Sequence, residues 1–189
     1  MGRYEVTQAQ WTAKMGSNPS QFQGASYPDA ASRPVEQVSW SMTQPFCTQN
    51  GFRLPTEAEW EYAYRASTTT AFHSYPAQPT GFNNDTLLSN IAWYSGNSSN
   101  QTPAVRGKTA NALGLHDMSG NVWEWCQDFF SDSYYAVSPP TNPTGPTTGG
   151  YRVTRGASWG NSNPGRASFR AYAPGFTDSD DGLRVVRNP

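Results

Sequence analysis

The sequence predicts an α+β fold that is rich in loops and built from short helices and small antiparallel sheets. Helix-capping signals fall in the first 67 residues, whereas later segments carry brief aromatic or β-branched runs between turn residues. Glycine (17) and proline (15) are frequent, and aromatic residues make up 14% of the chain. At 189 residues the chain is most simply one domain, residues 1–189, that packs with rings more than with aliphatic side chains.

Three capping boxes predict the three helices. In each box a serine or threonine is followed three residues later by glutamine or glutamate. The pairs are Thr7 with Gln10, Ser41 with Gln44, and Thr56 with Glu59. Gly16 and Gly51 stand where the first two helices would end. Pro45 fits the second helix only within its first turn, because proline donates no backbone hydrogen bond.

The third predicted helix carries three glutamates, Glu57, Glu59 and Glu61. Side chains two residues apart on a helix point away from each other, so a catalytic pair of carboxylates is not expected there. We expect these glutamates to complete the helix cap and to face solvent.

Short strands are predicted after Thr68. The runs "NIAWYSG" and "NVWEWCQDFF" combine aromatic and β-branched residues, which favours strands. Residues 138–150 contain four prolines, three glycines and no hydrophobic residue, which predicts an exposed loop. Beyond the loop, "YRVTRGASW", "RASFRAYA" and "GLRVVR" have the length of strands in a small antiparallel sheet.

The charge pattern excludes some partners. The net charge is −1, so nothing global draws the chain to nucleic acid or to an acidic membrane. Six of the 13 basic residues follow residue 150, and all six are arginines: Arg152, Arg155, Arg166, Arg170, Arg184 and Arg187. Because an arginine fork suits carboxylates and backbone carbonyls, whereas phosphate-binding patches usually include lysine, we expect structural arginines.

Membrane insertion is not expected, because no apolar run approaches 18 residues. The stretch after Met1, "GRYEVTQAQW", has neither a basic n-region nor an apolar h-region, so no signal peptide is expected in this chain. The sequence does not determine the cellular location of the protein; a location at the cell surface or export from the cell is compatible with it. Cys47 and Cys126 lie 79 positions apart, which fits no zinc spacing, and we expect buried free thiols.

Catalytic signals are weak. His73 and His116 are the only histidines, which gives little support to histidine-based catalysis. No glycine-rich phosphate loop of standard spacing occurs.

The stretch "SGNVWEW" leaves room for a structural calcium ion. Asn121 and Glu124 supply hard oxygens three residues apart in a glycine-led turn, and backbone carbonyls could complete the shell. An ordinary turn asparagine and an ordinary surface glutamate explain the same pattern.

Seven blocks of the sequence together resemble the formylglycine-generating enzyme family, the sulfatase-modifying-factor domain with a C-type-lectin-like fold. They run in order from residue 4 to residue 186: "YEVTQAQW", "PVEQVSW", "RLPTEAEWEYA", "NALGLHDMSGNVWEW", "RGASW", the spaced Arg166 and Arg170, and "GLRVV". The resemblance implies this fold for the whole chain and suggests the calcium role of Asn121 and Glu124. Function has to be argued from the site itself.

The resemblance does not extend to the chemistry of the sulfatase-activating members. In those members, two cysteines shortly after a "GGSW"-like motif bind copper and oxidise a substrate cysteine. Here those places fall near Asn161 and Arg166, and residues 151–189 contain no cysteine. Neither side chain offers the thiolate that this chemistry requires, so the sequence predicts no such activity. A diverged formylglycine-generating-enzyme-like oxidoreductase or accessory enzyme is the alternative function.

Members that lack those cysteines include the variable proteins of diversity-generating retroelements, and residues 156–184 resemble their variable segment. The resemblance implies a fixed scaffold made of Trp159, Arg166, Arg170, Pro174, Gly182 and Arg184. It implies ligand contacts at Gly160, Asn161, Ser162, Asn163, Phe169, Ala171, Tyr172, Ala173, Gly175, Phe176, Asp178 and Asp180. Many of these residue types can arise from an asparagine codon by changes at its adenines. An ordinary loop of a non-catalytic binding member would look similar, so a generic binding role stays open.

The resemblance therefore predicts a non-catalytic display protein. Small, polar and aromatic side chains would project from the segment as they do in other evolved binding surfaces. The expected partner is a protein or another cell-surface ligand, and the expected state is a monomer. No cofactor is required for this role, apart from the structural calcium ion that the Asn121 turn leaves open.

Overall fold

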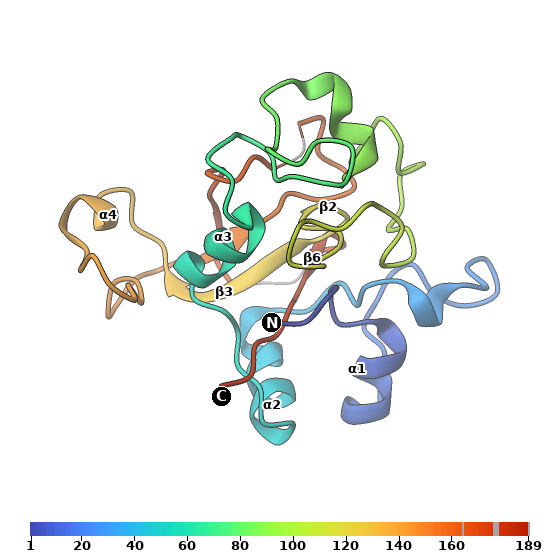
Figure 1. The fold of residues 1–189 in the computed structure, drawn as a ribbon. Helices are drawn as coiled ribbons and strands as arrows, with labels where there is room; N and C mark the ends of the chain where they lie inside the picture. The colour runs from blue at the N-terminus through green and yellow to red at the C-terminus, as the bar shows by residue number, and fades with distance from the viewer. Residues whose placement is uncertain (164, 176–177, 189) are drawn as a thin grey trace.

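The computed structural model describes residues 1–163, 165–175 and 178–188 and confirms an α+β fold with short helices and small sheets (Figure 1). The α-helices span Gln8–Met15 (α1), Trp40–Gln49 (α2), Glu57–Arg65 (α3) and Tyr134–Val137 (α4). Short 3-10 helices span Ala30–Ser32 (η1) and Asp85–Asn90 (η2). The strands are Ala92–Trp93 (β1), Ser119–Gly120 (β2), Trp123–Phe129 (β3), Arg152–Arg155 (β4), Ala171–Ala173 (β5) and Asp181–Gly182 (β6).

Helices α1 and α3 begin at the predicted caps. The Thr7 side chain accepts a hydrogen bond from the Gln10 backbone, and the Gln10 side chain accepts one from the Thr7 backbone. Thr56 and Glu59 form the same reciprocal pair at the start of α3. Helix α1 ends at Met15 and is capped by the predicted Gly16, whose φ of 76° lies in the left-handed region that glycine adopts without strain.

Helix α2 begins two residues earlier than predicted. Its cap is Ser39, whose hydroxyl accepts from the Met42 backbone, so the predicted box of Ser41 and Gln44 is wrong. Ser39 and Ser41 can each cap a helix by residue type, and Ser39 is the cap because its backbone is extended, as in other N-cap residues. Pro45 therefore lies inside the helix, beyond the first turn to which its missing N–H would confine it in isolation.

The main sheet has the strand order β5-β4-β3-β6. β3 pairs antiparallel with β4, and β4 with β5, as predicted. However, β6 runs parallel to β3, and β1 runs parallel to β2. The prediction of purely antiparallel sheets is wrong for these two pairs, because parallel pairing joins strands separated by a long connection and leaves no local sequence signal.

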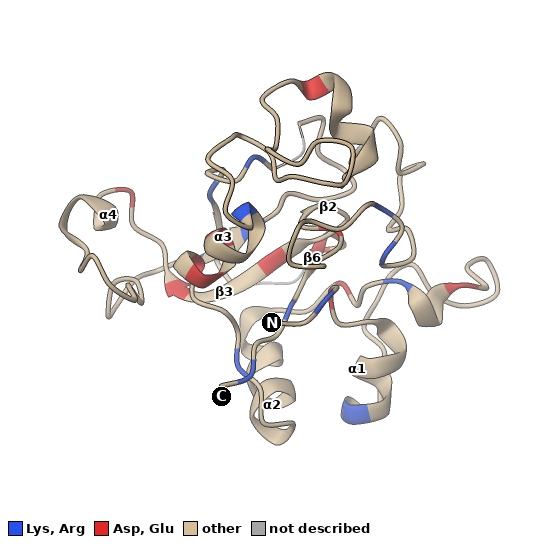
Figure 2. Ribbon diagram, in the orientation of Figure 1, with Lys and Arg blue, Asp and Glu red and all other residues tan. Residues whose placement is uncertain are grey.

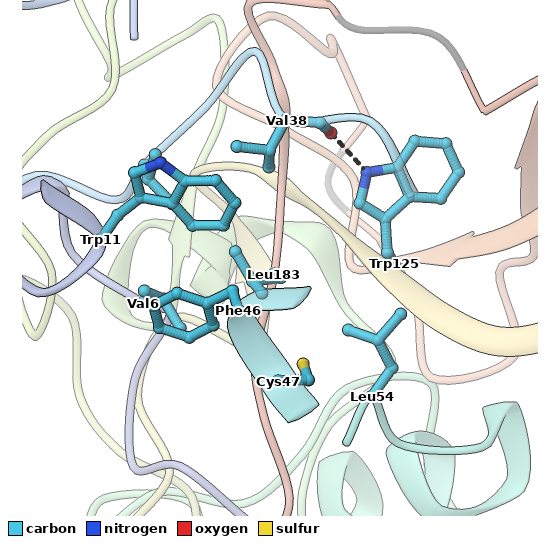
Figure 3. Close-up of a cluster of buried hydrophobic side chains, with 9 residues drawn as sticks. Val6, Trp11, Val38, Phe46, Cys47, Leu54, Trp125 and Leu183 are labelled. Carbon is cyan, nitrogen blue, oxygen red and sulfur yellow. Dashed lines mark hydrogen bonds between the residues drawn. The ribbon is translucent and has the colours of Figure 1, made fainter. Parts of the chain in front are cut away.

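One hydrophobic cluster packs α1 and α2 against β3 and the segment after β6 (Figure 3). Trp11 stacks on Phe46 with ring centroids 5.0 Å apart, and Trp125 Nε1 donates to the Val38 carbonyl at 2.8 Å. A second cluster packs α3 against β3 and β4; its larger members are Trp60, Tyr64, Leu115 and Met118. Together the two clusters hold the sheet between the N-terminal helices.

Cys47 and Cys126 are free and buried, as predicted. Burial raises the pKa of the Cys47 thiol to about 11 and raises that of Cys126 well above its ordinary value. Thiols in such surroundings stay protonated and unreactive, so both cysteines serve packing.

Residues 138–150 form an irregular loop in which no residue is buried, which confirms the predicted exposed loop. The loop follows α4, and the two project together from the left side of Figure 1. Within the part of the chain that the structure describes, no helix has the length and apolar character needed to cross a membrane.

Candidate functional site

Trp159 fixes the start of the segment 156–184. Its backbone N–H donates to the Asn121 carbonyl at 2.8 Å, and its indole Nε1 donates to the Ser179 carbonyl at 3.2 Å. Its ring stands edge-on to Phe22 with centroids 5.4 Å apart. One side chain therefore ties the beginning of the segment to its end and to the N-terminal region.

A small hydrogen-bonded group around Ser158 shapes the loop next to Trp159. The Asn161 side-chain oxygen accepts from the Ser158 backbone at 2.8 Å. The Ser158 hydroxyl lies 2.9 Å from that oxygen and 2.7 Å from a carboxylate oxygen of Asp180, whose pKa burial raises. Asn161 and Asp180 are among the predicted ligand contacts, yet their side chains serve the loop itself in this structure. Contact with a ligand at these two positions stays a prediction.

Arg170 anchors the middle of the segment on a buried carboxylate. Its Nε and Nη2 donate to the two oxygens of Glu57 at 2.6 and 2.8 Å. Arg155 on β4 reaches the same carboxylate at 3.0 Å and also reaches Glu61 at 2.7 Å. The expectation that the glutamates of α3 face solvent is therefore wrong for Glu57, which is only 2% exposed because two arginines converge on it.

Arg166 does not have the scaffold role that the resemblance implies. Its side chain is 48% exposed, and its only charged contact within the described residues is Asp85 at 3.4 Å. Its guanidinium also lies 5.5 Å from the centre of the Phe72 ring. Surface pairs of this kind add little to stability, so of the two spaced arginines only Arg170 holds the backbone from within.

Glu124 is fully engaged by protein donors. Arg184 donates to both of its oxygens, with its Nη2 at 2.7 Å, and Trp60 Nε1 donates at 2.6 Å. Asn121 adopts a left-handed φ of 63°, and its buried amide has no partner within the described residues. The Asn121 oxygen would suit a cation, but Glu124 would have to leave Arg184 to join it. The predicted pair therefore fits calcium poorly, and the calcium ion stays a prediction.

Two further buried carboxylates, those of Glu5 and Asp117, lie near the ion pair of Arg184 and Glu124. Glu5 lies 3.9 Å from Arg184, and neither of its oxygens has a donor within the described residues; one oxygen of Asp117 likewise lacks a donor. Burial, and then the Asp117 charge, raise the pKa of Glu5 well above its ordinary value, and burial raises that of Asp117 to about 6. Sequence reasoning missed Glu5, because no motif marks an acid in an extended segment as buried.

In the described residues, no three His, Cys, Asp or Glu side chains lie close enough together to hold a metal ion. His73 is buried beside Tyr64, and this burial lowers its pKa to about 4. His116 Nδ1 is bonded to the Lys108 carbonyl. His73 Nδ1 is bonded to the Ser74 carbonyl, whereas its buried Nε2 has no partner within the described residues.

An exposed aromatic group surrounds β5. Tyr172 is 54% exposed, and its ring centre lies 4.4 Å from that of Phe130 and 5.0 Å from that of Tyr151. Phe169, 46% exposed, lies 5.7 Å from Trp123 by the same measure. Sequence reasoning found Tyr172 and Phe169 but missed Tyr151 and Phe130, whose rings lie beside Tyr172 near the paired strands β4 and β5.

The other predicted contact positions differ in exposure. Exposed positions are Gly160, Ser162, Asn163 and Asp178, and half-buried positions are Ala171, Ala173 and Gly175. Ala173 packs against the cluster of Figure 3, so less of it is available to a ligand. Phe176 lies outside the described residues.

Comparisons with known proteins extend over the whole chain. The sulfatase-modifying factor enzyme 1-like domain matches residues 1–189. The chain is 32% identical to the chaperone protein LppX of Paenibacillus barcinonensis, across 100% of this chain and 79% of that protein. It is 38% identical to the formylglycine-generating enzyme of Streptomyces coelicolor, across 67% of this chain but only 42% of the enzyme.

Solved structures show the same fold. Treponema denticola variable protein 1 superposes with a TM-score of 0.88 and 33% identity, across 98% of this chain and 84% of that one. PvdO from Pseudomonas aeruginosa superposes with a TM-score of 0.75 across 97% of this chain and 77% of its own; at 24% identity this likeness concerns the fold alone. The predicted C-type-lectin-like fold of the sulfatase-modifying-factor type is thereby confirmed.

Proposed function

The chain belongs to the sulfatase-modifying factor enzyme 1-like family, and we propose that within this family it is a non-catalytic display protein. Its segment 156–184 binds ligands, chiefly proteins, through side chains carried on a fixed backbone. The observation that carries the proposal is the likeness to Treponema denticola variable protein 1 over 98% of the chain.

Different residues of the segment 156–184 hold its backbone and face solvent, which supports this proposal. Trp159 and Arg170 hold the backbone through contacts directed into the molecule. Phe169 and Tyr172 leave about half of their surface to solvent, where a ring adds little to folding. Exposed aromatic rings give large contact areas at a low cost in side-chain entropy, and such rings dominate many binding surfaces.

Residues outside the segment enlarge the proposed surface. Tyr151 and Phe130 pack beside Tyr172, and Tyr135 is 42% exposed. The Arg170 guanidinium lies 4.9 Å from the ring centres of both Phe130 and Tyr135, which holds these rings in place. The ligand would then contact aromatic rings outside the segment 156–184, which diversification of that segment leaves unchanged, beside the positions that differ between variants.

Diversification by a retroelement is the specific form of this role that we propose. It requires a reverse transcriptase gene and a near-copy of the coding sequence for residues 156–184 in the same genomic neighbourhood. Substitutions between the two copies should fall at adenines and at exposed positions such as Ser162 and Asn163. A neighbourhood without such a copy would leave only a generic binding role.

The enzyme alternative rests on the 38% identity to the Streptomyces coelicolor formylglycine-generating enzyme. Residues 151–189 contain no cysteine, and the two corresponding places fall near Asn161 and Arg166, so no thiolate pair is available for copper. We expect no conversion of a sulfatase-motif peptide cysteine to formylglycine, with or without copper, as measured by mass spectrometry. A copper-dependent mass change of the peptide would refute the display proposal.

The binding experiment compares two surfaces of the same protein. Cell-surface proteins that the immobilised wild-type protein retains are first identified by mass spectrometry. The affinity of the partner that binds most tightly is then measured for two variants. One variant replaces Ser162, Asn163, Phe169, Tyr172 and Asp178 by alanine together. The control replaces an equal number of exposed residues in the loop 138–150. We expect the first variant to lose the partner and the control to keep it, with both melting temperatures close to that of the wild type. Equal retention by the first variant would move the ligand site elsewhere.

A further inference from the structure

A pocket of about 560 Å³ opens between the two chain ends and helices α1 and α2. Buried Val6 and Phe46 line it together with Tyr4 and Val185. Phe52 also lines it and is 37% exposed, so part of this apolar surface faces solvent. The volume lies within the range of small-molecule sites, and the lining has the apolar character that such sites share.

The charged groups of the lining all have one sign. Arg3, Lys14 and Arg187 contribute to it, whereas no aspartate or glutamate does so among the described residues. Each of the three is exposed, and none pairs with an acidic side chain in the described part of the chain. Figure 2 shows basic residues at the lower end of α1 and close to the C-terminus. In a chain with 13 basic and 14 acidic residues, this is a marked local excess of positive charge.

Two neutral polar side chains of the lining already form a hydrogen bond within the protein. The Gln10 side-chain oxygen accepts from the Thr7 backbone in the cap of α1. The Asn50 amide donates to the Phe46 carbonyl at 2.7 Å. Arg3 Nε donates to the Gly114 carbonyl at 3.5 Å, whereas Lys14 and Arg187 form no side-chain hydrogen bond among the described residues. An anionic group in the pocket would therefore be met mainly by Lys14 and Arg187.

The pocket is separate from the display segment. Its described lining residues fall within 1–14, 46–52 and 185–187, and none lies within 156–184. Occupancy of the pocket is therefore independent of the proposed display function.

We propose that this pocket binds an anionic amphiphile, a small molecule with a hydrocarbon chain and a carboxylate or similar head group. The hydrocarbon chain of the ligand would cover the apolar surface of Phe46, Val6 and Phe52 and remove it from water, which favours binding. The head group would accept charge-assisted hydrogen bonds from the cations at the rim. A cationic amphiphile of the same length would meet like charges instead.

The test compares three probes that share a ten-carbon chain, in low salt and by isothermal titration calorimetry, with decanoate and decyltrimethylammonium below their micelle concentrations and decanol below its solubility limit. We expect decanoate to bind at least about ten-fold more tightly than decanol, and decyltrimethylammonium not to bind. The preference for decanoate should shrink as salt is added, because exposed charges are screened. Equal affinity for the three probes, or no binding of decanoate, would overturn the proposal.

Three variants locate the site. Lys14→Gln combined with Arg187→Gln should weaken decanoate binding about ten-fold or more, whereas Arg166→Gln, an exposed cation outside the pocket, should not change it. Ala13→Trp should abolish binding by filling the space. These positions are exposed, so melting temperatures should stay close to that of the wild type. Wild-type affinity in the double variant would reject the site. If the protein binds phosphatidylglycerol vesicles but not free decanoate, the proposal of a small-molecule pocket is wrong and the basic residues contact a membrane surface instead.

Discussion

The buried side of the main sheet is held by charged side chains, whereas the exposed face of the segment 156–184 carries aromatic rings. Inside, Arg184 and Glu124 are 0% and 1% exposed and satisfy each other. Outside, Phe169 and Tyr172 keep about half of their surface in solvent and rest on other rings. From this difference we infer that the buried ion pairs fix the backbone, and we expect the exposed rings to contribute less to its stability.

The strongest way to break this arrangement is Arg184→Ala. It would leave the Glu124 carboxylate buried without its main partner, and Glu5 would lose its nearest cation. We expect the free energy of unfolding to fall by about 3 to 5 kcal/mol. Denaturant melts measure the loss, with the exposed Arg187→Ala as a control expected within about 0.5 kcal/mol. A small loss for Arg184→Ala would mean that the buried pair does not hold the sheet.

Arg170 and Arg166 give a matched pair of smaller changes. Arg170→Ala removes two charge-assisted hydrogen bonds to buried Glu57, so we expect a loss of about 1 to 3 kcal/mol. Arg166→Ala removes one exposed ion pair to Asp85 and should cost no more than about 0.5 kcal/mol. The same denaturant melts decide, and equal losses would show that Arg166 also belongs to the scaffold.

Asp181 is a buried carboxylate that forms no ion pair within the described residues. Burial, and then the charges of Asp180 and Asp178, raise its pKa to about 8. The folded state therefore binds this proton more tightly than the unfolded chain, whose aspartates titrate near about 3.9. The stability that protonation confers is complete below about pH 4 and is lost as the pH rises to about 8. Relative to wild type, Asp181→Asn should thus become progressively more stable across this window. A difference that is constant from pH 4 to pH 8 would contradict the buried, unbalanced carboxylate.

The smallest effect is expected from calcium removal. Because Arg184 already neutralises Glu124, EGTA should shift the melting temperature by no more than about 1 °C. A larger fall, restored by added calcium and absent in Asn121→Ala, would instead establish the metal site that the sequence predicts.

Local signals explain which parts of the fold could be predicted. The caps at Thr7 and Thr56 depend on residues three positions away, and both were found from the sequence. The burial of Glu57 depends on Arg170, 113 residues further along the chain, and no local pattern reports such a contact. The direction of β6 beside β3 is hidden for the same reason.

The candidate site was predictable to a similar extent. Two arginines spaced by four residues suggested two scaffold positions, but only Arg170 faces a buried carboxylate, whereas Arg166 points to the exposed Asp85. Tyr151 joins the aromatic surface because β4 and β5 pair, and that register is a property of the folded sheet. Residue types could suggest a binding surface, whereas its margins required the tertiary structure.

The two ends of the chain are joined by backbone hydrogen bonds, from Gly2 to Val185 at 2.8 Å and from Val6 to Leu183 at 2.9 Å. Because residues 2–6 lie against residues 183–185, a protein made of residues 1–189 alone can be tested for circular permutation. A short linker between the ends, with new termini opened in the loop 138–150, would leave every buried residue in its place. The permuted protein would then present its termini beside α4 instead of beside α1 and α2, which changes the direction from which the same binding surface can be tethered.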